Sequence, residues 1–144
     1  MSDNNEKKAY FGDHVTYLRK AIEEDNSFIY HLVEEFLKTD LSVTVLEMPS
    51  FEEFFKSDTK RYIITNGHDK MGFVQILKNN EVGYFVDPKY QGRGIGTEAV
   101  KILMELNPRS RHFATINNSN EASIKLIKKL GFKPKATIFE KINE

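Results

Sequence analysis

Glycine recurs at every second position in one short segment of the chain, residues 91–96 (QGRGIG). Residues 82–86 before it have β-strand composition, and a helical repeat of apolar residues begins near Gly94. The first turn of a helix presents main-chain N–H groups without partners and a partial positive charge, and glycine leaves these groups uncovered. Because Arg93 adds a full charge and Thr97 adds a hydroxyl, the segment is suited to hold a phosphate group.

Two common phosphate-binding motifs do not fit this segment. A P-loop ends in Gly-Lys-Ser/Thr, which is missing here. The dinucleotide fingerprint needs a glycine at the position of Thr97, and an acidic residue about 20 positions further on, where Ile116 and Asn117 stand. A tight turn that only packs the chain is the alternative that the glycine spacing alone leaves open.

A sheet and several helices must position this turn, and the sequence predicts both. Alternating or β-rich runs predict strands over residues 14–21, 62–65, 71–77, 81–86, 112–117 and 136–142. Apolar residues at helical spacing predict helices after an Asp25 N-cap, over 51–56, from Ile95 to Asn107, and from an Asn118–Glu121 capping box to Gly131. The order β-α-α-β-β-β-α-β-α-β predicts an α/β fold, a single domain with a mixed central sheet flanked by helices. We place this domain at residues 14–144 and expect residues 1–13 to be loosely ordered.

Composition excludes several classes of protein. The 144 residues include no cysteine, which excludes a disulfide scaffold, a thiolate nucleophile and cysteine-ligated zinc, and we expect a cytoplasmic location. No run of about 18 apolar residues could span a membrane, and the polar start lacks the apolar core of a signal peptide. The four histidines are scattered without metal-ligand spacing, so no metal is predicted. A net charge of zero argues against nucleic acid as a partner, because binding its phosphates needs a basic surface.

The charges are divided unevenly along the chain. Residues 1–88 carry 10 basic and 16 acidic residues, whereas residues 89–135 carry 10 basic and 3 acidic residues. Chance scatter explains such a division about as well as function does. Under the functional interpretation, the basic segment handles an anion and the acidic segment meets a cation.

The glycine segment also resembles the motif of a known family. Gln91-x-x-Gly94-x-Gly96 matches the (Arg/Gln)-x-x-Gly-x-(Gly/Ala) signature of the GCN5-related N-acetyltransferases, the GNAT superfamily. The surrounding VGYFVDPKYQGRGIGTEAV is similar to the branch that includes ribosomal-protein and spermidine N-acetyltransferases, as are residues 120–123 (NEAS) and 129–132 (KLGF). The resemblance covers nearly all of residues 14–142 and is strongest over 82–132.

This resemblance implies an enzyme that uses acetyl-CoA as co-substrate and transfers the acetyl group directly to an amine, without a metal. It implies that the turn holds the pyrophosphate of coenzyme A and that the pantetheine arm lies along the end of residues 82–86. It also implies that the Val86 amide polarises the acetyl carbonyl. The residues that the resemblance assigns to the coenzyme are Phe85, Val86, Gln91, Gly92, Arg93, Gly94, Ile95, Gly96, Thr97 and Asn120.

The sequence offers one candidate for the catalytic acid and one for the catalytic base, each with an alternative. Many family members use a Tyr as general acid four residues after the position of Ser123, but this chain has Ile127 there. Ser123 itself is therefore the candidate acid, with helix packing as its alternative role. Glu81 is the candidate general base, although the family's usual position for this residue falls on Asn80. A shift of one residue along a strand turns the side chain to the other face of the sheet, unless a bulge intervenes. A water chain is the alternative base.

The acceptor is inferred from charge. In the family, the two early helices frame the acceptor, and the acidic residues of this region favour a cationic primary amine, such as a polyamine, an aminoglycoside or a basic peptide N-terminus. Relatives often dimerise, so a homodimer is an open prediction, whereas neither nucleic acid nor a membrane is expected as a partner. The alternative function is a catalytically impaired module that only binds acyl-CoA.

Overall fold

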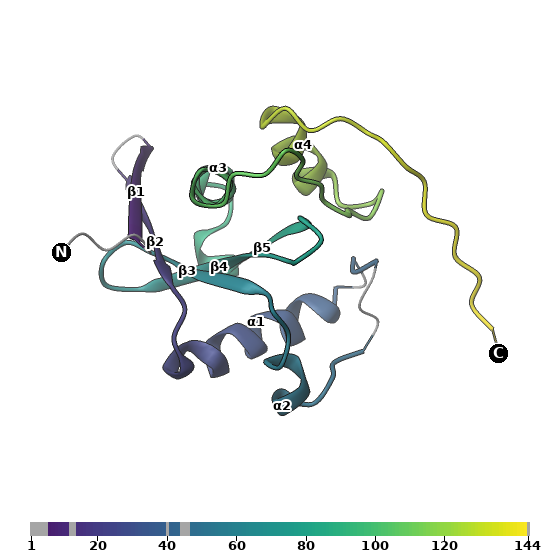
Figure 1. The fold of residues 1–144 in the computed structure, drawn as a ribbon, viewed down its shortest axis with the longest axis horizontal. Coiled ribbons are helices and arrows are strands. Elements are labelled where there is room, and N and C mark those ends of the chain that lie inside the picture. The colour runs from purple at the N-terminus through teal and green to yellow at the C-terminus, as the bar shows by residue number, and fades with distance from the viewer. Residues whose placement is uncertain (1–5, 12–13, 40, 44–46, 144) are drawn as a thin grey trace.

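The structure, a computed structural model, describes residues 6–11, 14–39, 41–43 and 47–143. Within these residues five strands form one sheet: β1 (Glu6–Phe11), β2 (His14–Lys20), β3 (Lys60–Thr65), β4 (Lys70–Ile76) and β5 (Val82–Val86). The accompanying α-helices are α1 (Asn26–Leu37), α2 (Phe51–Phe54), α3 (Ile95–Leu106) and α4 (Glu121–Lys129). Short 3-10 turns, η1 (Glu23–Asp25) and η2 (Pro88–Tyr90), follow β2 and β5. Figure 1 shows α1 and α2 beyond one face of the sheet and α3 and α4 beyond the other.

The sheet separates two apolar cores. Its strands are adjacent in chain order, and every neighbouring pair is antiparallel. Because side chains alternate along a strand, Ile64 packs with Val100 of α3 on one face, whereas Ile63 and Phe73 pack with Ile29 of α1 on the other. Because both faces of β3 and β4 are buried, the central residues of these strands are buried in succession. A strand with only one buried face would alternate apolar and polar residues instead.

A buried ion network fixes the start of α1. Asp25 is 1% exposed, and its carboxylate accepts hydrogen bonds from both Nη atoms of Arg19, at 2.8 and 2.9 Å, and from the Ile22 N–H at 2.9 Å. The Nζ atom of Lys70 lies 2.8 Å from the same carboxylate. Burial alone would raise the pKa of Asp25, but these partners outweigh it and hold the pKa well below its usual range. Asp25 is at the N-cap position as predicted, but its side chain makes no cap hydrogen bond to α1 and ties β2 to β4 instead.

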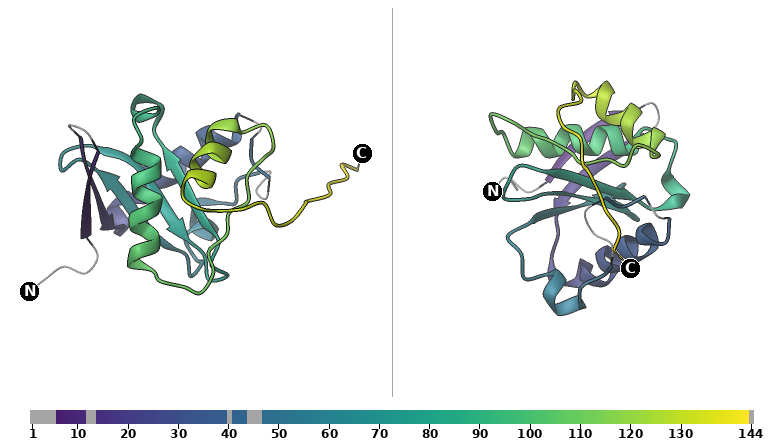
Figure 2. Two further views of the ribbon diagram at one scale, coloured as in Figure 1. Left: turned by 90° about the horizontal axis from the view of Figure 1, so that it is seen from above. Right: turned by 90° about the vertical axis from the view of Figure 1, so that its right-hand side faces the viewer.

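Two predicted strands are wrong. Within residues 112–117 only Phe113 pairs, through a parallel bridge to Glu81, so the parallel part of the predicted mixed sheet is reduced to this contact. Residues 136–142 form no regular element, and Ile138, Phe139 and Ile142 are 58, 92 and 78% exposed. Figures 1 and 2 show this segment leaving the body of the molecule. An alternating sequence shows that a strand could have one apolar and one polar face. It does not supply the neighbouring strand whose main-chain groups a strand must hydrogen-bond.

Two further details correct the sequence predictions. Residues 6–11, expected to be loosely ordered, form β1 and pair with β2, because the edge of β2 offers main-chain hydrogen-bond partners. The rest of the expected loose segment, residues 1–5 and 12–13, lies outside the described residues. The cap of α4 is Asn120 rather than Asn118, since the Asn120 side chain accepts from the Ser123 N–H. The antiparallel β3–β4–β5 meander, helix α3 and the left-handed Gly131 (φ +93°) after α4 are confirmed.

Candidate functional site

The glycine turn leads from the end of β5 and η2 into α3. Gly92 and Gly94 have φ angles of +78° and +77°, a left-handed conformation that a side chain disfavours. Gly94 is the N-cap of α3, and the first main-chain hydrogen bond of the helix runs from the Glu98 N–H to the Gly94 carbonyl, at 3.2 Å. The N–H groups of residues 95–97 precede this bond, so they are the unpaired donors that a helix start offers to an anion.

Side chains fix this turn against the preceding segment. The Gln91 Nε2 atom donates to the Val86 carbonyl at 2.9 Å and so links the turn to the end of β5. The Arg93 Nη2 atom donates to the Lys89 carbonyl at 3.2 Å, and its guanidinium carbon lies 5.5 Å from the centroid of the Tyr90 ring. Arg93 is exposed, so a cation stands beside the unpaired donors of the turn.

One edge of β5 is open next to the turn. β4 covers the other edge, whereas on this side the described residues make a single bridge, in which the Val82 N–H donates to the Phe113 carbonyl at 2.8 Å. Main-chain groups alternate in direction along an antiparallel strand, so those of Tyr84 and Val86 face the same open edge as Val82. The main-chain groups of Phe85 face β4 instead. The Val86 amide is therefore available to a ligand that lies along this edge.

A close approach of β4 sets the position of this edge. Gly72 pairs with Val86, and a Cβ atom on Gly72 would lie 2.2 Å from the Phe85 carbonyl oxygen and 2.9 Å from the Val86 Cα. The Phe85 ring stacks on Phe73 with 4.8 Å between centroids and meets Phe36 of α1 edge-on at 5.3 Å. Gly72 was not identified from the sequence, although a glycine inside a β-rich run is a signal of close main-chain approach.

Ser123 of α4 is joined to β5 by Tyr84. The Tyr84 hydroxyl donates to the Ser123 Oγ atom at 2.5 Å. Burial raises the pKa of Tyr84 more than the hydrogen bond to Ser123 lowers it, so the phenol stays protonated at neutral pH. Because Tyr84 supplies the proton of this hydrogen bond, the proton of Ser123 is left to point elsewhere. Tyr84 was not among the residues selected from the sequence, because a strand tyrosine carries no local signal of a partner 39 residues away.

Gly96 and Asn120 hold this pair in place. A Cβ atom on Gly96 would lie 3.1 Å from Leu126 of α4 and 3.6 Å from the Tyr84 ring, so the missing side chain lets α3, α4 and β5 meet. The Asn120 Oδ1 atom accepts from the Ser123 N–H at 3.2 Å, which leaves its Nδ2 group without a hydrogen bond in the described part of the chain.

Glu81 lies apart from these groups. It precedes β5 and is half-buried, and it stands five residues before Val86. At roughly 3.3 Å per residue, an extended strand places the two main-chain positions about 17 Å apart. The structure thus gathers the turn, the open edge at Val86 and the Tyr84–Ser123 pair around β5, α3 and α4, and it leaves Glu81 at the other end of β5.

An antiparallel sheet with an open strand end beside a helix start with unpaired main-chain donors is suited to an extended, phosphorylated ligand. The sequence profile of the Acetyltransferase (GNAT) family matches residues 20–132, and the chain belongs to this family. Spermidine N(1)-acetyltransferases of Escherichia coli strains K12 and O157:H7 are 29% identical over an alignment of 84 residues, which covers 51% of this chain and 45% of each relative. The match therefore spans less than half the length of these curated relatives.

Solved structures share the fold. A GCN5-related N-acetyltransferase from Kribbella flavida superposes with a TM-score of 0.71 at 16% identity, over 85% of each chain. A Salmonella typhimurium protein solved with acetyl-CoA gives a TM-score of 0.70 at 18% identity, over 84% of this chain and 81% of the other. The ribosomal L7/L12 α-N-protein acetyltransferase RimL, solved with coenzyme A, gives 0.61 at 18% identity, over 85 and 82%. At these identities the likeness establishes the fold alone.

The acyl donor of the GNAT family is acetyl-CoA, and the residues present fit it. A diphosphate needs several hydrogen-bond donors, which the turn supplies together with the Arg93 cation. A pantetheine arm needs an unpaired strand edge, which β5 supplies. No group of metal-ligating side chains occurs among the described residues, and no helix in the same residues is long and apolar enough to cross a membrane.

Proposed function

We propose that this protein transfers the acetyl group of acetyl-CoA to a primary amine by direct attack. In this reaction the amine nitrogen forms a bond to the thioester carbonyl carbon, the carbon–sulfur bond breaks, and the leaving thiolate takes up a proton. The observation that carries the proposal is the junction of an anion-binding turn with the open main-chain edge of β5 at Val86. The family membership of residues 20–132 supports the same reaction.

The glycine turn and the open edge of β5 bind different parts of acetyl-CoA in this proposal. The N–H groups of Arg93 to Thr97 receive the pyrophosphate, and Gly92 leaves room for its approach. Gln91 holds the turn to β5 through the Val86 carbonyl. The pantetheine arm lies along Tyr84 and Val86, with the Phe85 side chain against α1 and the Nδ2 group of Asn120 directed to the arm. The Val86 amide then stabilises the oxyanion that forms on the acetyl carbonyl.

Ser123 protonates the leaving thiolate in this proposal. Its Oγ atom accepts a hydrogen bond from Tyr84 at 2.5 Å, so its own proton is free to be donated to sulfur. Tyr84 can return a proton to Ser123 along the same hydrogen bond. Glu81, about 17 Å from Val86 along the strand, acts as general base only through intervening water, in agreement with the water chain considered from the sequence.

A cationic acceptor fits the charge of the helices on the opposite face of the sheet. α1 carries the exposed Glu34 and Glu35, and α2 carries the exposed Glu52 and Glu53. Among the described residues, Lys38 pairs with Glu35 and Lys56 with Glu53, whereas no ion pair includes Glu34 or Glu52. The unpaired acidic groups attract a cation over distances of about a Debye length, roughly 8–10 Å. Similarity to spermidine N(1)-acetyltransferases supports an amine of this kind.

The remaining partner predictions come from the sequence and from the C-terminal segment. Two copies associate in this proposal, since Ile138, Phe139 and Ile142 are all exposed within five residues, and apolar side chains that are exposed together favour burial in an interface. A cytoplasmic location and the lack of nucleic-acid or membrane partners stay predictions from composition.

A thiol-release assay across a panel of amines tests the function. We expect release of coenzyme A with polyamines, aminoglycosides or basic peptide N-termini, and slower release with neutral and acidic amines of similar size. Raising the salt concentration should reduce the advantage of the cationic amines, because screening weakens their attraction. Higher rates with neutral or acidic acceptors would exclude the cationic class, whereas tight acetyl-CoA binding without turnover on any amine would leave only the binding module.

A further inference from the structure

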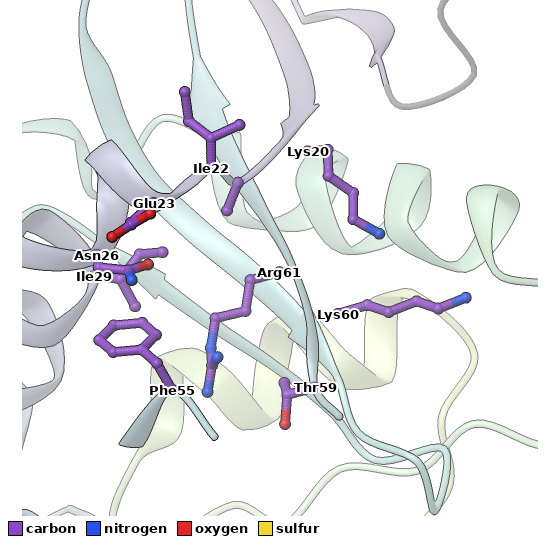
Figure 3. Close-up of a pocket in the computed structure, with 10 residues that line it drawn as sticks. Lys20, Ile22, Glu23, Asn26, Ile29, Phe55, Thr59, Lys60 and Arg61 are labelled. Atoms are coloured by element: carbon purple, nitrogen blue, oxygen red, sulfur yellow. The ribbon is translucent and has the colours of Figure 1, made fainter. Parts of the chain in front are cut away.

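A cavity lies away from the coenzyme turn. Its volume is about 250 Å³, and its walls come from the segment after β2, from α1, from the end of α2 and from the start of β3. None of the residues of the glycine turn, β5 or α4 lines it. Figure 3 shows Arg61 of β3 entering this cavity beside Phe55.

The groups that contact Arg61 in the cavity are neutral. Its Nε atom donates to the Gln75 Oε1 atom of β4 at 3.0 Å. Its guanidinium carbon lies 4.6 Å from the centroid of the Phe54 ring and 5.3 Å from that of Phe55. These contacts leave the two Nη groups without a hydrogen bond in the part of the chain that the structure describes.

The charge of Arg61 lacks a counter-ion among the described residues. The ion pairs of the described chain include Arg19 with the buried Asp25, but none includes Arg61. Arg61 is half-buried, and burial lowers its pKa to about 10. Partial burial weakens the hydration of this charge, and the aromatic contacts make up for only part of that loss. A guanidinium in this position therefore favours an anionic ligand.

The other walls of the cavity restrict the kind of anion. Ile22, Ile29 and Phe55 give it an apolar side, whereas Thr59 and Asn26 add neutral polar groups. Lys20 and Lys60 also border the cavity, but their ammonium ends point away from Arg61 (Figure 3). Glu23 at the rim opposes a second negative charge. One inward cation beside one carboxylate suits a monoanion better than a phosphate dianion, and the planar fork of arginine matches a carboxylate.

We propose that this cavity is a binding site for a small monocarboxylate with an apolar body, whose carboxylate pairs with the Nη groups of Arg61. The apolar body lies against Ile29 and Phe55. The volume of about 250 Å³ is below the range of roughly 300–1,000 Å³ typical of sites for larger ligands, which agrees with a small acid. β4 stands between β3 and β5 in the sheet, so this site is separate from the coenzyme edge.

Phenylacetate, titrated into the 144-residue protein and followed by calorimetry, tests this site. We expect saturable binding of phenylacetate, and no binding of the neutral isostere phenylacetamide. Arg61→Gln should weaken the binding of phenylacetate at least roughly tenfold, as expected for loss of a charge-assisted pair. Arg111→Gln is the matched control, because Arg111 also stacks on a ring, 4.6 Å from the Phe113 centroid, but is exposed and outside the cavity; it should leave the affinity unchanged.

A second measurement on the unmodified chain covers the case in which Arg61→Gln does not fold. Phenylglyoxal labels accessible arginines, and peptide mass spectrometry reads each site. Phenylacetate should protect Arg61 and leave Arg111 labelled to the same extent as without ligand. Equal affinity of wild type and Arg61→Gln, binding of phenylacetamide, labelling of Arg61 unchanged by phenylacetate, or protection by inorganic phosphate alone would each overturn the proposal.

Discussion

Replacing Gly72 by alanine should damage both stability and acetyl transfer. The new Cβ atom would stand 2.2 Å from the Phe85 carbonyl oxygen and 2.9 Å from the Val86 Cα, whereas ordinary contacts begin near 3.4 Å. Both obstructing atoms belong to the main chain, so no side-chain rotation relieves the clash, and β5 must move away from β4 by about 1 Å. Overpacking of this kind costs about 1–3 kcal/mol or more, and we expect the upper end of that range. A displacement of about 1 Å at the reacting groups should lower kcat/KM roughly a hundredfold.

Gly83→Ala is the matched control for this experiment. Gly83 of β5 lies in the same β4–β5 strand pair as Gly72 of β4, but its added Cβ atom would meet only the Gln75 side chain, at 3.4 Å. Urea unfolding gives the change in the free energy of unfolding, and initial rates of thiol release give kcat/KM for acetyl-CoA. We expect Gly83→Ala to stay close to wild type in both. If Gly72→Ala matches Gly83→Ala in stability and in kcat/KM, the close approach of β4 does not position the Val86 edge.

Three further substitutions test other parts of the structure. Gly94→Ala should lower the free energy of unfolding by about 1–2 kcal/mol, because the φ of Gly94 is +77°, and it should also raise the KM for acetyl-CoA. Gly67→Ala is the control, because Gly67 has a φ of +96° and stands in open space. It should lower stability by the same amount and leave the KM for acetyl-CoA unchanged. Ser123→Ala should lower kcat roughly a hundredfold with little change in acetyl-CoA affinity, and Tyr84→Phe should lower kcat less; an unchanged rate in Ser123→Ala removes this hydroxyl from the reaction. Asp25→Asn should lower stability at pH 7 by about 1.5–3 kcal/mol, because a neutral amide loses the charge-assisted hydrogen bonds that the buried carboxylate accepts from Arg19 and Lys70. Since the folded-state pKa of Asp25 is depressed, its contribution is present above the ordinary Asp pKa of about 3.9 and is lost as the pH falls below it, so the wild type and Asp25→Asn should converge in stability in acid, as urea unfolding across pH can verify.

Much of the fold followed from local patterns. The strands that became β2 to β5 and the helices α1 to α4 were predicted within a few residues, because buried faces impose a period of about two or 3.6 on the sequence. Residues 112–117 and 136–142 show where that reasoning fails. Both have strand-like composition, but only Phe113 found a main-chain partner, and pairing is decided by which edges lie nearby in space.

For the site, the sequence by itself determined the helix start with its glycines, the Arg93 charge and the family signature, because these depend on neighbours within a few positions. Tertiary structure alone decided that Tyr84 meets Ser123, that Gly72 brings β4 against the Val86 edge, and that Arg61 pairs with no carboxylate among the described residues. Each of these contacts joins residues from separate elements. Their meeting depends on strand register and on how helices pack across the sheet, and neither is encoded in the spacing of residues along one segment.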